Sequence, residues 1–99
     1  MSSKPVDPAF VPKLAKKARL RFDRHSGKHM IVYPERGLEL NDSAAEIAKR
    51  LDGSRSVMDI ANDIVGEKKL HPHQLDEVVS DVIEFVDGLR KKGLLEQGE

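Results

Sequence analysis

The sequence of 99 residues contains no cysteine, which excludes disulfide bonds and thiolate metal sites and is compatible with a reducing compartment. It also has no apolar run long enough to cross a membrane and no hydrophobic segment typical of a signal peptide. We therefore expect a soluble, cytoplasmic protein. At this length we expect one domain with a modest core, burying about 65% of the surface of the unfolded chain.

Signs of catalytic and metal sites are equally scarce. No serine, histidine or acidic residue belongs to a nucleophile constellation that spacing alone identifies, and the seven glycines are scattered rather than gathered in a phosphate-binding loop. The histidines form two close pairs without a third ligand at a metal-binding spacing, so surface positions are the simpler interpretation. The pairs are His25 with His29 and His71 with His73. The sequence therefore predicts a protein that is not an enzyme and holds no metal.

The charge is balanced overall but unevenly distributed along the chain. Residues 1–36 carry nine Lys and Arg against three Asp and Glu, a net charge of +6. Residues 37–99 carry eight against fourteen, a net charge of −6. This asymmetry suggests charged partners, or two faces for two partners, but a solvated surface with no binding role explains it equally well.

Alternating apolar and polar residues predict three short strands behind an N-terminal segment, residues 1–13. That segment is rich in proline and is expected to be a disordered tail or linker. The strands are expected at 18–23, with a basic outer face, at 29–33 and at 38–40. The second is apolar on both faces, so it should be central. Because the connections are short, the three strands are expected to form an antiparallel meander. Its third strand can then lie at an edge of the sheet.

Two short helices are expected after the strands. Ser43 with Glu46, and Ser56 with Asp59, fit capping boxes at the start of each. Each helix has an apolar face and is followed by a glycine suited to end it. A helix, a short turn and a second helix are the helix-turn-helix arrangement in outline.

A longer third helix is predicted from Pro72, which suits a first helical position, to about Lys92. Apolar residues flank its core-facing stripe, so the apolar arc spans about 160°, wider than the ~100° of an ordinary surface helix. Either residues 1–13 or a partner could cover the excess. The stripe consists of Leu75, Val79, Val82, Val86 and Leu89. Strands followed by three helices predict an α+β fold, winged helix-turn-helix-like, over residues 14–99.

Two kinds of partner fit such a fold. A winged-helix DNA-binding protein is one, because the basic first strand could touch phosphates. However, the third helix carries five acidic residues before its first basic one, Arg90, and these would repel DNA. The other partner is an extended peptide that pairs with the edge at Leu38–Leu40 beside the third helix. The pattern supports a purely structural role equally well. In that role the two leucines fill the core and Glu39 protects the edge from aggregation.

A series of short motifs runs along residues 12–95. They are Arg19-Leu20-Arg21-x-Asp23, Pro34-Glu35-Arg36, Leu40-Asn41, Ala45-x-Ile47, Asp52-Gly53, Val57-x-x-Ile60, Asp81-Val82-x-x-Phe85 and Gly93-Leu94. In order and spacing the chain resembles the pyrroloquinoline quinone biosynthesis protein D family, the peptide chaperones of that pathway. It departs from the family at residues 48–51, where a more apolar run is expected.

The resemblance implies a winged-helix-like recognition element for a ribosomally made precursor peptide. Members of this family bind the precursor, protein A, and present it to protein E, a radical S-adenosylmethionine enzyme that crosslinks a Glu and a Tyr of the peptide. The iron–sulfur clusters belong to that enzyme, so this chain would need no cofactor. Related recognition elements hold a leader peptide as an extra strand, between the third strand and the third helix. The resemblance implies neither a nucleic-acid nor a membrane partner.

Candidate site residues follow from the pattern and the resemblance together. The edge strand would act mainly through its backbone, Arg36 could pair with an acid of the precursor, and either flank of the third helix could form the wall. Arg19 and Arg21 are candidates for docking the enzyme partner, on charge asymmetry alone. So short a contact predicts micromolar affinity, about −8 kcal/mol. The residues expected at the peptide are Arg36, Leu38, Glu39, Leu40, Asn41, Val78, Val82, Ile83 and Phe85.

Overall fold

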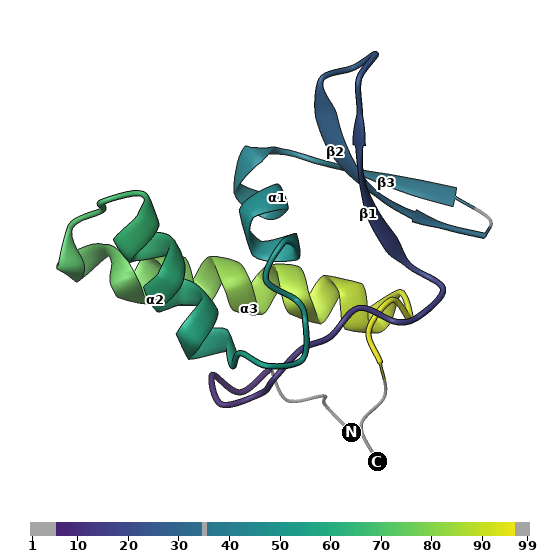
Figure 1. Cartoon of the computed structure of the whole chain (residues 1–99). Helices are drawn as coiled ribbons and strands as arrows, with labels where there is room; N and C mark the ends of the chain where they lie inside the picture. Colours follow the sequence, from purple (N-terminus) through teal and green to yellow (C-terminus); the bar gives the residue numbers. More distant parts are fainter. Residues whose placement is uncertain (1–5, 35, 97–99) are drawn as a thin grey trace.

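A computed structural model describes residues 6–34 and 36–96 of the chain. An antiparallel three-stranded sheet is followed by three helices, and the strand order β1-β2-β3 confirms that the second strand is central. The β1–β2 hairpin projects away from the helices, while α1 lies between the sheet and α3 (Figure 1). The elements are β1 (Arg19–Asp23), β2 (Lys28–Tyr33), β3 (Arg36–Leu40), α1 (Asp42–Ala48), α2 (Val57–Glu67), a 3₁₀ turn (Pro72–Gln74) and α3 (Leu75–Lys91). The α+β, winged-helix-like prediction is confirmed.

The two faces of the sheet differ in chemistry because side chains alternate along each strand. Ile31 pairs with Leu20 on one side and Leu38 on the other, so these apolar residues share the face that packs on the helices. Ile31 itself is fully buried. The opposite face carries Arg19 and Arg21 and looks away from the helices.

The helix starts show where local sequence decides the structure. α2 begins as predicted, because Ser56 and Asp59 form the reciprocal capping box. α1 begins two residues earlier than the Ser43 prediction: the side chain of Asn41 accepts a hydrogen bond from the Ala44 amide at 2.8 Å. The Ser43–Glu46 capping box is therefore wrong, since Asn41 already satisfies a free amide of the first turn.

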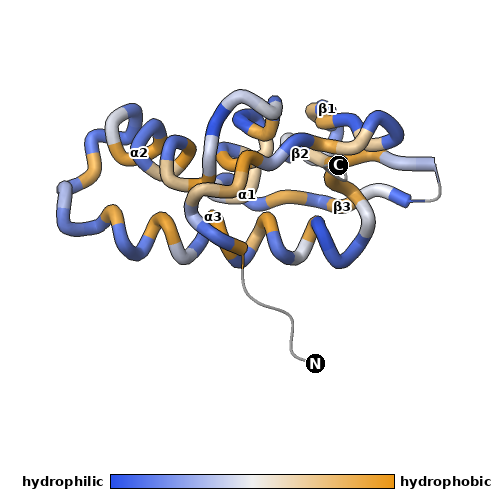
Figure 2. Tube along the Cα trace, turned by 90° about the horizontal axis from the view of Figure 1, so that it is seen from below, coloured by the Kyte–Doolittle hydropathy of each residue, from blue (hydrophilic) through white to orange (hydrophobic). Residues whose placement is uncertain are grey.

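The third helix and its continuation complete the core. Four residues of the predicted stripe are buried on α3, and the fifth, Leu75, is half-buried. Apolar positions recur along α3 in Figure 2. Gly93 takes a φ of 74°, which turns the chain back after the helix, and Leu94 and Leu95 are then buried as the sequence suggests. No helix within 6–34 and 36–96 is long and apolar enough to cross a membrane.

The described part of the N-terminal segment, residues 6–13, follows a defined path against α2. The first amides of that helix donate to this segment: Val57 N to Phe10 O at 2.8 Å and Met58 N to Pro8 O at 2.9 Å. Amides at a helix start have no partner within the helix, so these bonds satisfy them. Val6 and Pro12 are buried. Residues 6–13 thus differ from the disordered tail expected for 1–13, of which 1–5 lie outside the described residues.

Candidate functional site

β3 is an edge strand. Within the described residues it pairs with β2 on one side only, so the backbone groups on its other side are open to a further strand. Leu40 is buried and Leu38 half-buried against the helices, whereas Glu39 points to the opposite face, where its carboxylate lies 3.8 Å from Lys28 Nζ. The strand therefore offers backbone at its edge while its leucines belong largely to the core.

A groove lies between this edge and α3. It encloses a cavity of about 280 Å³. Phe85 and Gly88 form the wall from α3, and Ala44 contributes from α1. The remaining lining residues are Leu38, Glu39, Leu40, Asn41, Glu84, Leu89 and Lys92. The sequence left open which flank of the third helix faces the edge strand, and the structure assigns the flank of Phe85.

The groove does not end where β3 ends. A second cavity shares Asn41, Ala44 and Phe85 with the first and follows α1 to Asp81. A third shares Asp81 with the second and extends past Val78 to the 3₁₀ turn. We refer to these three adjoining cavities as the furrow: it follows β3 and then α1 on one side, and the length of α3 on the other.

The structure does not bring all of the predicted wall residues to the furrow. Val82 is fully buried in the core. Ile83 lies two positions before Phe85, about 160° away around the helix at about 100° per residue, and lines none of the three cavities. Arg36 is exposed at the start of β3, outside the cavity linings. Of the predicted wall, Val78 and Phe85 remain.

Sequence reasoning missed most residues of the furrow, but a signal exists for three of them on α3. Asp81, Glu84 and Gly88 lie with Phe85 at spacings of three and four residues, which place them on one face of α3 beside the core stripe. Ala44 and Gly88 are small, as expected where two elements leave room for a third. A search for this second, mixed stripe would have found the face.

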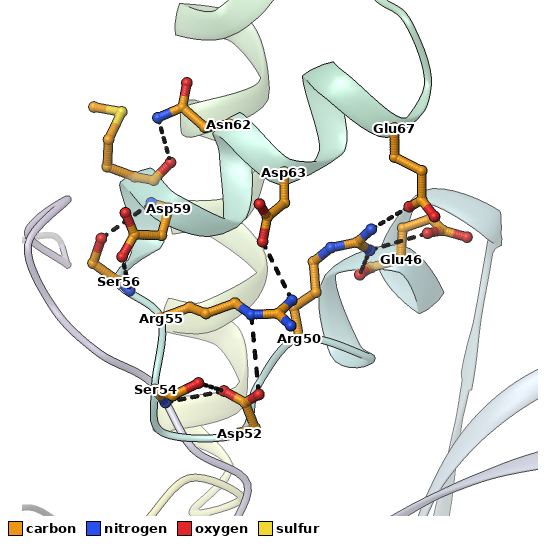
Figure 3. A network of polar contacts seen from close by, with 11 residues as sticks. Glu46, Arg50, Asp52, Ser54, Arg55, Ser56, Asp59, Asn62, Asp63 and Glu67 are labelled. Atoms are coloured by element: carbon orange, nitrogen blue, oxygen red, sulfur yellow. Dashed lines mark hydrogen bonds and ion pairs between the residues drawn. The ribbon is translucent and has the colours of Figure 1, made fainter.

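The position of α1, which forms one wall of the furrow, is fixed by a polar network (Figure 3). Arg50 Nη1 donates to the Glu46 carbonyl at 2.7 Å and to the Glu46 carboxylate at 3.1 Å, and Nη2 donates to Glu67 at the end of α2. The hydrogen bond from Arg50 lowers the pKa of the Glu46 carboxyl, against the opposing effect of burial. Lys49 is exposed, whereas the Arg50 side chain is only 11% exposed between its acidic partners and Leu51 is buried. The polar residues within 48–51 therefore belong to this network.

Arg19 and Arg21 lie on a different surface. Both are exposed on the face of the sheet away from the helices, opposite Val32 and Met30 respectively. Val32 is also exposed. The structure therefore separates the two predicted regions: the furrow runs beside the helices, and the basic strand faces outward.

An open edge strand beside a helix-walled groove, on a three-stranded sheet followed by three helices, defines a winged-helix-like domain suited to strand addition. The chain belongs to the PqqD family: the family model for coenzyme PQQ synthesis protein D (PqqD) matches residues 28–95. This confirms the resemblance seen in the sequence.

Individual relatives agree with that assignment. A protein of Xanthomonas euvesicatoria pv. vesicatoria named PqqA binding protein is 38% identical, over 85% of this chain and 88% of its own. A bifunctional coenzyme PQQ synthesis protein C/D of Methylorubrum extorquens is 35% identical over 88% of this chain but only 23% of its own. The solution structure of the PqqD part of Methylobacterium extorquens PqqCD, described as a functional, stand-alone recognition element for ribosomally synthesized and post-translationally modified peptides, has a TM-score of 0.78 and 30% identity, covering 93% of this chain and 95% of its own.

Proposed function

We propose that this chain binds the ribosomally made precursor peptide of pyrroloquinoline quinone biosynthesis and presents it to a radical S-adenosylmethionine enzyme. The observation that carries the proposal is the open edge of β3 beside the furrow. The names of the relatives support it, because one is called a PqqA binding protein and another a recognition element. The chain acts by binding, and the chemistry belongs to its partner.

The precursor would enter as a fourth strand. Its backbone would hydrogen-bond to the free side of β3, and alternate side chains would point into the groove against Phe85 and the aliphatic carbons around Gly88. β3 has five residues, so only a short segment of peptide can pair with it. Ordering that segment opposes binding, which keeps the affinity near micromolar, about −8 kcal/mol.

An amide-shift titration of the labelled protein with precursor peptide tests this function. Saturable shifts at residues 36–41 and along the furrow side of α3 are expected with the peptide, and none with duplex DNA. The acidic residues of α3 that line the furrow would repel phosphates. Shifts with DNA and none with peptide would instead favour a winged-helix DNA-binding protein.

Presentation requires that the enzyme reach the complex without covering the furrow. The outward face of the sheet meets this requirement, since Arg19 and Arg21 are exposed there beside the apolar side chain of Val32. A partner with an acidic surface would be attracted to this face and could contact the peptide-bound edge at the same time.

Reversing the charge of both arginines tests the docking face. We expect Arg19→Glu with Arg21→Glu to weaken enzyme binding at least fivefold at low salt, because like charges would then meet across the interface. Binding of the precursor should stay within twofold of wild type. Calorimetric titrations with the enzyme and with the precursor measure both affinities. Lys16→Glu with Lys17→Glu, the same change at exposed positions before β1, serves as the control in each. Equal enzyme affinity in all three proteins would exclude docking at this face.

A further inference from the structure

The furrow is longer than the strand that it accompanies. Beyond β3 it follows α3 from Glu84 back to the start of the helix, next to Gln74 of the 3₁₀ turn. Ten residues of helix at 1.5 Å each span about 15 Å, enough for about four residues of extended chain. A peptide that leaves β3 in the direction of α1 therefore continues along a surface that is already hollowed, instead of entering bulk water.

The far end of the furrow differs in chemistry from the groove at β3. We call it the α1–α3 pocket: a cavity of about 360 Å³ with an apolar floor and an acidic rim. The rim consists of Asp42, Glu77 and Asp81. The floor consists of Ile47, Ile64, Leu70 and Val78. Ser43 and Gln74 supply neutral polar groups.

The acids of this pocket divide into two groups. Glu46 lies within 4 Å of Lys49, Arg50 and Lys68, so its charge is compensated, and Lys68 Nζ, 3.9 Å away, is the one cation in the lining. Asp42, Glu77 and Asp81 are exposed and form no ion pair within the described residues. Three carboxylates around an apolar floor repel one another and attract a cation.

We propose that the precursor peptide, after pairing with β3, continues into the α1–α3 pocket and places a lysine or arginine side chain there. The proposal rests on the function given above and adds a specificity to it. The alkyl stem of such a side chain would lie on Ile47 and Val78 while its charged end stays among the carboxylates, as long basic side chains do at the margins of apolar surfaces. A purely apolar side chain would cover the floor but leave the like charges of the rim together.

Continuity between the pocket and the β3 groove identifies the occupant. The cavities share lining residues in sequence, first Ala44 and Phe85, then Asp81. One extended chain can therefore fill all three, and the basic side chain should lie about four residues from the segment that pairs with β3. The peptide is thus recognised at two places, by backbone pairing at β3 and by charge in the α1–α3 pocket.

A matched pair of charge reversals on α3 tests the proposal. Asp81→Lys changes the rim, whereas Asp76→Lys makes the same change at an exposed position of the same helix outside the cavity linings. Calorimetric titration with precursor peptide should give at least fivefold weaker binding for Asp81→Lys and less than a twofold change for Asp76→Lys. Raising the salt concentration should weaken wild-type binding more than that of Asp81→Lys.

Substitution of the peptide completes the test. When each Lys or Arg of the precursor is replaced by Glu in turn, one replacement should weaken binding to the wild type and be partly restored by Asp81→Lys. Equal effects of the two charge reversals would overturn the proposal that this pocket binds a basic side chain. So would the absence of any peptide substitution whose effect Asp81→Lys restores. Peptide-induced shifts at residues 36–41 would in either case still support the proposed function. If the wild type itself bound no precursor, both would fall.

Discussion

Replacing Gly88 by tryptophan should weaken binding of the precursor peptide at least tenfold and leave the domain folded. Gly88 lines the groove between β3 and α3. A Cβ added there meets no atom from the rest of the protein within 4 Å, so the start of a larger side chain fits, and the indole beyond it would occupy the groove. Glycine in a helix interior is about 0.5–1 kcal/mol less favourable than alanine, and tryptophan lies between the two, so the substitution does not weaken the helix itself. The variant would fill the space that the peptide needs.

Two control variants separate occlusion of the groove from effects on the helix. Gly88→Ala makes the same backbone change with one small methyl group, and should bind the peptide within about twofold of wild type. Gly66→Trp places the same large side chain on α2 at a residue that lines no cavity of the furrow, and an added Cβ there likewise meets nothing within 4 Å. Calorimetry with precursor peptide compares the four proteins. Unchanged affinity for Gly88→Trp would mean that the peptide does not occupy this groove.

Truncating Val6 and Phe10 together to alanine should lower the free energy of unfolding by about 3 kcal/mol. Val6 is buried and Phe10 packs against the core, while the backbone between them bonds to the first turn of α2. Removing both side chains leaves a cavity beneath this segment and loosens its hold on the helix start. Against the 5–15 kcal/mol of a typical domain, this loss is easily measured by urea unfolding.

Val11→Ala provides the control within the same segment. Its side chain is 45% exposed, so its truncation should change the free energy of unfolding by less than about 0.5 kcal/mol. An unchanged urea midpoint for the double variant would mean that residues 6–13 contribute nothing to stability, as a disordered tail would.

Local chemistry made much of the fold predictable from the sequence. The strands alternate apolar and polar residues, and the Ser56–Asp59 box and the stripe of α3 follow rules that act over a few residues. The start of α1 shows where such rules fail. Asn41 and Ser43 are both good capping residues, and the path of the chain leaving β3 decides between them. Only the three-dimensional structure contains that information.

The path of residues 6–13 is not predictable from the sequence for a related reason. Its prolines and lack of periodicity are typical of a linker, because the segment forms no regular element of its own. Its order comes from single contacts with distant residues, such as Pro12 O accepting from the Gly53 amide at 3.1 Å. No pattern within residues 1–13 encodes those partners.

The candidate site was predictable in outline only. The edge strand and the third helix could be identified from pattern and resemblance, but α3 has apolar residues on both flanks of its core stripe. The spacing of Val82 fits a wall residue and a core residue equally well, and the side chain lies in the core. The choice between the flanks of Phe85 and Ile83 depends on where α1 and β3 pack, which is a tertiary property.

The open edge of β3 also has a consequence for solution behaviour. A second copy of this chain can pair along that edge through the same backbone groups that a peptide would use. Self-association through β3 and peptide capture would then be mutually exclusive, and the two would compete by mass action. The apparent dissociation constant for the peptide would rise with total protein concentration, so the monomer–dimer equilibrium would set how much recognition element is available.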